Sequence, residues 1–143
     1  MIHKLSINCE LARNILTRFI HSEITRTGYK RAVVALSGGI DSALSCYLAA
    51  EAMGAENVLA VRMPYKTSSA DSLEDAQRVI DATGVQSLTI PITAMADALI
   101  DQFPEMDSMR RGNIMARCRM ITIYDQSAAF NGLVVGTGNK TEI

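Results

Sequence analysis

Apolar residues near the start of the chain recur at helical spacing. The repeat predicts an amphipathic helix over residues 5–26 that ends near Gly28, a residue type that often terminates helices. We expect residues 1–28 to form this leading helix and residues 29–143 to form the domain that follows it. The apolar positions that carry the repeat are Leu5, Leu11, Ile15, Leu16, Phe19 and Ile20.

A second pattern, of short apolar runs alternating with helical repeats, fills the rest of the chain. Residues 32–36 are an uninterrupted apolar run, which is typical of a strand buried on both faces of a parallel sheet. The pattern predicts an α/β fold: a doubly wound parallel sheet, Rossmann-like, with helices on both faces and ligands at the carboxyl ends of the strands. Strands are predicted at 32–36, 58–62, 87–90 and 133–135, helices at 42–54, 72–82, 93–102 and 112–131, and longer polar loops at 63–72 and 103–111.

Composition narrows the classes of function. A chain of 143 residues, 48% hydrophobic and 20% charged, fits one compact domain. The formal net charge of -1 lacks the excess of basic residues that is typical of proteins that bind nucleic acids or anionic lipids. No run reaches the roughly 18 apolar residues of a membrane span, and the start lacks the apolar core of a secretory signal. We therefore expect a cytoplasmic protein whose partners are small molecules or proteins.

The cysteines and histidines show no spacing typical of a metal or redox site. Cys9, Cys46 and Cys118 are far apart among apolar residues, so we expect all three to be reduced and buried. His3 and His21 lie on the leading segment, away from every motif described below, and are expected at the surface.

The strongest chemical signal is the segment ALSGGIDS, residues 35–42, between the first predicted strand and the helix after it. Gly38 and Gly39 let the backbone approach an anion, and the helix N-terminus directs amide groups toward it. Ser37 and Ser42 add hydroxyl donors. A kinase-type Walker loop is excluded because the segment contains no lysine. The pattern therefore predicts a site for a polyphosphate.

This segment resembles the SGGxDS pyrophosphatase loop of ATP-dependent adenylating amidotransferases, whose fold is adenine nucleotide alpha hydrolase-like. The resemblance implies that the loop holds the β- and γ-phosphates of ATP as a leaving group and that Asp41 is a ligand of Mg2+. The plainer alternative is a glycine-rich turn in which Ser42 caps the helix and Asp41 favours its dipole. The ATP-binding residues implied are Ala35, Leu36, Ser37, Gly38, Gly39, Ile40, Asp41 and Ser42.

Three further segments resemble the NAD synthetase family. Arg62 begins RMPY, which is similar to the RxPY segment and implies a contact with the adenosine of ATP. The segment GNIMARCRM resembles the GNIxARxRM helix of the family, which implies that Arg117 contacts deamido-NAD. The segment GTGNKTE resembles GTxNKxE, which implies that Thr137 contacts ATP and that Glu142 is a second Mg2+ ligand.

Each of these segments also has a plainer alternative. The first is an edge arginine ahead of a proline turn, the second a helix with exposed arginines, and the third a turn at the end of a strand. Helical geometry places Asn113 and Arg117 on one face, four residues apart, and directs Arg119 elsewhere. A dinucleotide-binding GxGxxG interpretation of the last segment fails because Thr141 occupies the final glycine position.

The resemblance implies a reaction and a set of partners. The nicotinate carboxylate of deamido-NAD attacks ATP to form an adenylate, and ammonia then displaces AMP to produce the amide of NAD. ATP is a co-substrate, Mg2+ a cofactor and a homodimer the expected assembly. Nothing before the leading helix is long enough for a glutaminase domain, so free ammonia is the implied nitrogen donor, although a separate glutaminase subunit stays open.

The resemblance also implies that the ATP pyrophosphatase domain over residues 29–143 is incomplete at its C-terminus, because the family continues well beyond the GTxNKxE strand. Two alternatives to an NAD synthetase remain. One is another pyrophosphatase-loop ligase, similar to GMP synthetase, that acts on a purine nucleotide or a tRNA base. The other is a regulatory module that binds ATP without turning it over.

Overall fold

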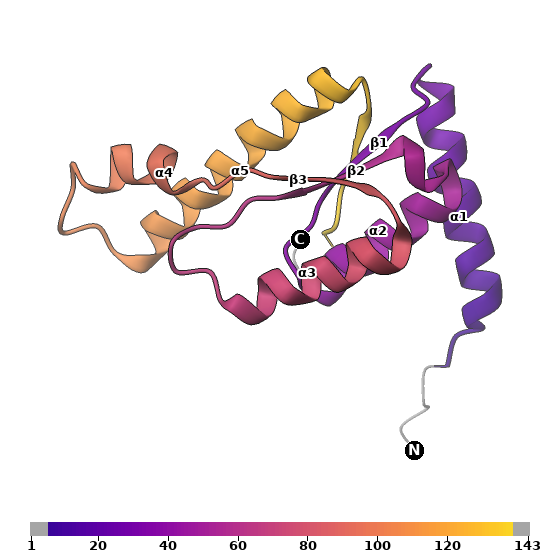
Figure 1. The fold of residues 1–143 in the computed structure, drawn as a ribbon, viewed down its shortest axis with the longest axis horizontal. Coiled ribbons are helices and arrows are strands. Elements are labelled where there is room, and N and C mark those ends of the chain that lie inside the picture. Colours follow the sequence, from indigo (N-terminus) through magenta and orange to yellow (C-terminus); the bar gives the residue numbers. More distant parts are fainter. Residues whose placement is uncertain (1–5, 139–143) are drawn as a thin grey trace.

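The apolar runs near residues 32 and 58 become the two central strands of a four-stranded parallel sheet (Figure 1). The computed structural model describes residues 6–138, and within them the strand order is β3-β2-β1-β4. The strands are β1 (Ala32–Ala35), β2 (Val58–Arg62), β3 (Gln86–Thr89) and β4 (Leu133–Val135). The helices are α1 (Cys9–Arg26), α2 (Ile40–Met53), α3 (Ala70–Thr83), α4 (Thr93–Ile100), α5 (Ser108–Phe130) and the single 3-10 turn η1 (Ala55–Asn57).

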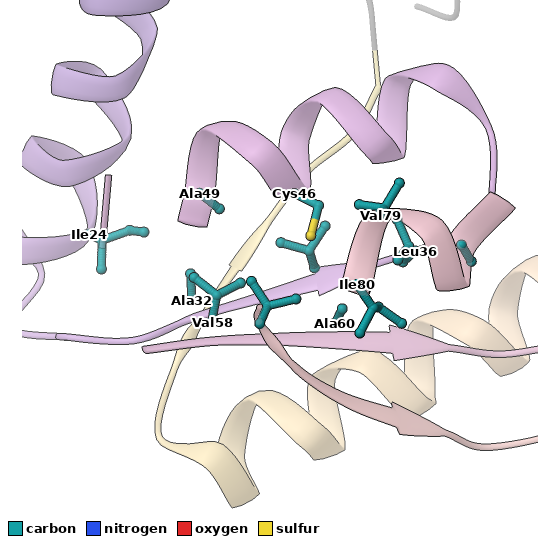
Figure 2. Packing of buried hydrophobic residues seen from close by; sticks show 12 residues of the cluster. Ile24, Ala32, Leu36, Cys46, Ala49, Val58, Ala60, Val79 and Ile80 are labelled. Carbon is teal, nitrogen blue, oxygen red and sulfur yellow. The ribbon is translucent and has the colours of Figure 1, made fainter. Parts of the chain in front are cut away.

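Helices cover both faces of the sheet, because alternate side chains of β1 and β2 enter two separate hydrophobic cores. Val34 and Ala60 pack toward α1, α2 and α3, and Figure 2 shows Cys46 of α2 and Ile80 of α3 in this layer. Val33 and Val61 point the other way, into a core built with α4 and α5. All four of these strand residues are fully buried. The predicted doubly wound α/β fold is therefore confirmed.

Side-chain caps set the starts of three helices. The Asn8 side chain accepts a hydrogen bond from the amide of Leu11 at 3.0 Å, which begins α1 later than the residue 5 predicted from its apolar repeat. Ser69 caps α3 and Asp107 caps α5 in the same way. Both helices consequently begin inside segments that were predicted as loops, so the polar segments at 63–72 and 103–111 are shorter than expected. The sequence does not separate the two cases, because helix caps and loops both favour polar side chains.

The cysteines differ from their predicted environment at one position. Cys46 and Cys118 are buried as expected, and burial raises the pKa of the Cys46 thiol, which keeps it protonated. Cys9, by contrast, is exposed, because it is the first residue of α1 and lies beyond the part of that helix that reaches the core at Ile24. His21 is exposed, as predicted, whereas His3 lies outside the described residues. Within residues 6–138 no helix is both long enough and apolar enough to cross a membrane.

Candidate functional site

The loop between β1 and α2 is held in shape by its own two serine hydroxyls. The Ser42 side chain is buried, accepts a hydrogen bond from the amide of Ser37 at 3.2 Å and donates one to the carbonyl of Gly39 at 2.9 Å. The Ser37 hydroxyl accepts from the amide of Gly39 at 3.2 Å and lies 3.0 Å from the Ser42 hydroxyl. Ser42 therefore shapes the loop from within, while Ser37 is exposed at its surface.

Gly38 is required in this loop for two independent reasons. Its φ is +88°, in the region that side chains disfavour, and a Cβ built on it would lie 2.2 Å from the backbone carbonyl oxygen of Ser72 at the start of α3. Gly39 adopts an ordinary φ of -76°, and the nearest atom to a Cβ there is 3.4 Å away. The close approach of the loop to α3 thus depends on the first glycine and not on the second.

The N-terminus of α2 is well suited to an anion. Gly39 is its N-cap residue and provides no side-chain hydrogen bond, in contrast to the capped starts of α1, α3 and α5. Amide groups in the first turn of a helix have no partner within the helix, and the helix dipole adds positive potential there. A phosphate at this point would serve as the cap.

A cavity of about 290 Å³ lies beside this loop, at the carboxyl ends of β1 and β2. Its walls combine apolar side chains, hydroxyl groups and two arginines from different elements, a mixture suited to a ligand with both an apolar ring and charged groups. The residues that line it are Ala35, Leu36, Ser37, Arg62, Met63, Pro64, Ser68, Ser72, Leu73, Ala76 and Arg119.

Arg62, at the end of β2, is held in the cavity wall by an amide side chain. Its Nη1 donates to Oε1 of Gln77 on α3 at 2.7 Å, and Nε2 of Gln77 in turn donates to Oδ1 of Asp81 at 2.8 Å. The Nε atom of Arg62 is buried and has no hydrogen-bond partner within residues 6–138. Buried donors are seldom left without a partner, and a ligand in the adjacent cavity would supply one. The structure therefore places the predicted Arg62 in the wall of the cavity.

Arg119 is a cavity residue that the sequence pattern did not single out. It comes from α5, on the opposite helical layer to the loop, and its Nε donates to the carbonyl of Met63 at 3.1 Å. The predicted Arg117, two residues earlier, is exposed and does not line the cavity. Periodicity correctly separated the two arginines onto different faces, but only the packing of α5 against β2 shows which face meets the cavity.

Two of the remaining predicted residues, Asp41 and Thr137, follow strands at the same edge of the sheet. Asp41 is exposed in the first turn of α2, and Ile40 beside it is 80% exposed. Thr137 follows β4, the neighbour of β1, and is half-buried without lining the cavity. Glu142, the other predicted Mg2+ ligand, lies outside the described residues.

The chemistry of Asp41 fits a magnesium ion held jointly with a nucleotide. No group of three or more His, Cys, Asp or Glu side chains that could hold a metal occurs between residues 6 and 138. Mg2+ is usually bound through one or two carboxylates together with phosphate oxygens and water, so a full protein cage is not required. A single carboxylate in the first turn of a helix whose N-terminus suits a phosphate meets that description.

The segment that forms one wall of the cavity is fastened to α4. The hydroxyl of Tyr65 donates to Oδ1 of Asp97 at 2.7 Å, and Nζ of Lys66 lies 2.7 Å from Oδ2 of the same carboxylate. Hydrogen bonds from Lys66 and then from Tyr65 lower the pKa of Asp97, with a smaller contribution from the charge of Arg111. The carbonyl of Pro64, a cavity residue, also accepts from the amide of Ile92 at 2.9 Å. These bonds keep the wall in place.

Comparison with known proteins gives consistent matches over almost the whole chain. The family model described as NAD synthase matches residues 12–143. An NH3-dependent NAD+ synthetase of Trichlorobacter lovleyi is 54% identical over 140 residues, which are 98% of this chain and 51% of that protein.

Two solved structures are similar in fold. The NH3-dependent NAD synthetase of Campylobacter jejuni, in complex with nitrate, has a TM-score of 0.89 and 36% identity over 96% of this chain and 59% of its own. A glutamine-dependent NAD+ synthetase of Acinetobacter baumannii, in complex with ADP, has a TM-score of 0.89 and 31% identity over 99% of this chain and 28% of its own. The chain spans about half the length of the curated relatives it matches.

The geometry at Gly38 leads to a first prediction. We expect Gly38→Ala to lower the free energy of unfolding by at least about 2 kcal/mol, because it adds a clash with Ser72 to the cost of a positive φ. Gly84→Ala is the matched control, since Gly84 also has a positive φ, of +69°, but no atom within 4 Å of the added Cβ. Urea unfolding of both variants measures the difference. Equal losses of unfolding free energy in the two variants would show that the close contact with Ser72 does not contribute to the effect.

The ion pair on Asp97 predicts a pH dependence. Because its folded pKa lies below the unfolded value of about 3.9, its contribution to stability is complete above that value and is lost as the pH falls through the folded pKa. Asp97→Asn should therefore lower the thermal midpoint at pH 7, by an amount that shrinks as the pH approaches 3. Asp101→Asn, at the exposed end of the same helix, is the control. If Asp97→Asn lowers the thermal midpoint by the same amount at every pH, the ion pair is not the cause of the loss.

Proposed function

The chain belongs to the NAD synthase family, and on that premise we propose that it takes part in the ATP-dependent amidation of deamido-NAD with ammonia. One observation carries the proposal: Ser37 of the SGGxDS loop, which leads into the uncapped N-terminus of α2, lines a cavity whose wall also contains two arginines. The proposed phosphate-binding groups and a partly enclosed space for the rest of a nucleotide thus lie side by side at the carboxyl edge of the sheet.

The chemistry explains why ATP is needed. A carboxylate is a poor acceptor for ammonia, because an oxide or hydroxide ion would have to leave. Attack of the carboxylate oxygen on the α-phosphorus forms an oxygen-phosphorus bond and releases pyrophosphate. Ammonia then attacks the carbonyl carbon of the adenylate, AMP leaves with the bonding electrons, and loss of the ammonium proton produces the amide. The catalytic work of the protein is to position the reactants and stabilise the developing charge.

We assign the leaving pyrophosphate to the loop and to the start of α2. We assign Ser37, Gly38 and Gly39 to contacts with its oxygens, for which the amide of Gly39 would exchange its bond to the Ser37 hydroxyl, while Ser42 keeps the loop in shape. Asp41 would hold Mg2+, which when bound offsets charge on the phosphate oxygens, and Glu142 stays predicted as its second ligand. The other ATP contacts proposed are Ala35, Leu36, Ile40, Arg62 and Thr137.

We assign deamido-NAD to the exposed side of α5, near Arg117. That side chain is accessible to a large ligand, whereas Arg119 on the same helix turns toward the cavity. A guanidinium group suits the phosphate and ribose oxygens of a dinucleotide. In this arrangement α5 lies between the two substrates, and residues 29–143 act as one unit in binding them. We place the reaction in the cytoplasm, with free ammonia as the nitrogen donor.

The function is tested by calorimetric titration of the purified protein with each ligand separately. We expect binding of Mg-ATP and of deamido-NAD, weaker ATP binding in EDTA, and no binding of xanthosine monophosphate. Arg117→Ala should weaken deamido-NAD binding by about 1.5–3 kcal/mol and leave ATP largely unaffected.

Other results of the titration would favour the alternatives. Binding of ATP without deamido-NAD indicates a regulatory nucleotide-binding module. A preference for xanthosine monophosphate indicates a ligase similar to GMP synthetase.

We also propose that the protein is a homodimer that buries the apolar face of α1. Leu16 is 43% exposed and, with Leu44 and Tyr47 of α2, lines an apolar groove of about 360 Å³. Exposed apolar groups gathered in this way are typical of an interaction surface. The larger set of exposed apolar side chains on α1 is Leu11, Ile15, Leu16 and Phe19.

Sedimentation equilibrium tests the dimer. We expect the wild-type protein to sediment as a dimer and Leu16→Glu to sediment as a monomer, because a carboxylate on the buried face cannot be solvated. Asn14→Glu introduces the same charge at an exposed position of the same helix and should leave the dimer intact. A monomeric wild type, or dissociation by both variants, would contradict the proposed interface.

A further inference from the structure

The cavity is lined by positively charged side chains without acidic side chains to neutralise them. Arg62 and Arg119 both line it, whereas no aspartate or glutamate does. Within residues 6–138 neither arginine forms an ion pair with a carboxylate. Two guanidinium groups that line one partly enclosed space raise the positive potential within it, which favours binding of an anion. The composition of the cavity wall therefore indicates an anionic ligand.

Arg119 is held so that most of its donors stay available to such a ligand. Its Nε–H is used for the bond to the Met63 carbonyl, which ties the side chain to the end of β2. A guanidinium has five N–H donors, so four remain on its two Nη atoms, and no hydrogen bond from them occurs in the described part of the chain. A planar fork fixed at Nε is well arranged to bind two oxygens of one phosphoryl group.

The position of Arg119 relative to the loop indicates which phosphate it meets. Ser37 of the loop lines the cavity, and Arg119 lines it from the opposite helical layer, where its side chain is bonded to the carbonyl of Met63. If the loop binds the terminal pyrophosphate, the next charged group along the nucleotide is the α-phosphate. That phosphorus is the atom attacked in the adenylation step, and negative charge around it must be stabilised there.

We propose that Arg119 binds the α-phosphate of ATP and stabilises it during adenylation, an assignment that rests on the proposed function. Arg117 and Arg119 then have separate roles, since α5 directs one toward solvent and the other into the cavity. The adenosine, the α-phosphate and the pyrophosphate are accordingly bound by different groups of residues, so their contributions can be measured separately.

The experiment compares adenosine, AMP and pyrophosphate binding in Arg119→Gln and wild type by calorimetry. We expect AMP affinity to fall about tenfold or more, the size expected for hydrogen bonds to a charged group, with adenosine and pyrophosphate affinities unchanged. Arg119→Lys keeps the charge but not the fork, and should recover part of the AMP affinity. Arg110→Gln, an exposed arginine of the same helix, is the matched control and should bind AMP as wild type does.

The same measurements can overturn the proposal. If Arg119→Gln weakens adenosine as much as AMP, then the residue acts only by holding the Met63 carbonyl. If pyrophosphate alone is weakened, Arg119 belongs to the leaving-group site instead. A third outcome separates the two proposals. If Arg119→Gln lowers the affinity for AMP but the wild-type protein does not bind deamido-NAD, the proposed reaction is contradicted and the assignment of Arg119 stands.

Discussion

The structure depends on the burial of β1 and β2 on both faces. Val33 and Val34 point to opposite sides of the sheet, and each is fully buried in its own core. Strands enclosed in this way have no room for polar side chains along their length, because an unpaired polar group there would be costly. The polar residues that can act on a ligand are consequently displaced to the strand ends. Since the strands are parallel, their carboxyl ends meet at one edge, where the cavity lies.

A second constraint joins that edge to the helices around it. The loop after β1 packs so closely on the start of α3 that only a glycine fits at Gly38. Ser42 is used to hold the loop, and Gln77 of α3 holds Arg62. The phosphate loop, the cavity wall and α3 are thus parts of one packed unit. A group that is held before the ligand arrives loses less conformational freedom on binding, which favours a precise site.

The two sides of the site differ in how they are built. On the loop side, the proposed binding groups are backbone amides and short hydroxyls, which are uncharged and already held by hydrogen bonds within the loop. On the α5 side the binding group is the long guanidinium of Arg119, which gains its position from a single hydrogen bond to Met63. The wall at Pro64 is itself fastened to α4 through Asp97. Both helical layers therefore contribute to the wall of the cavity.

The sequence by itself determined the class of fold and the place of the phosphate loop. Buried parallel strands leave uninterrupted apolar runs, and the loop, its glycines and the following helix are contiguous, so local pattern is enough to recognise them. Helix starts were less predictable, because Ser69 and Asp107 are polar residues that suit a cap as well as a loop. Cys9 was wrongly expected in the core because its sequence neighbours are apolar.

Only the tertiary structure decided which side chains meet across the cavity. Arg117 and Arg119 are two residues apart in one motif, and periodicity separates their faces without saying which face turns toward β2. Arg119 donates to the carbonyl of Met63, which is 56 residues earlier in the chain, and Gly38 of the loop lies against the backbone of Ser72 in α3. Contacts of this kind depend on how helices are placed over the sheet, which is set by the packing of both cores together. Local sequence patterns do not determine that placement.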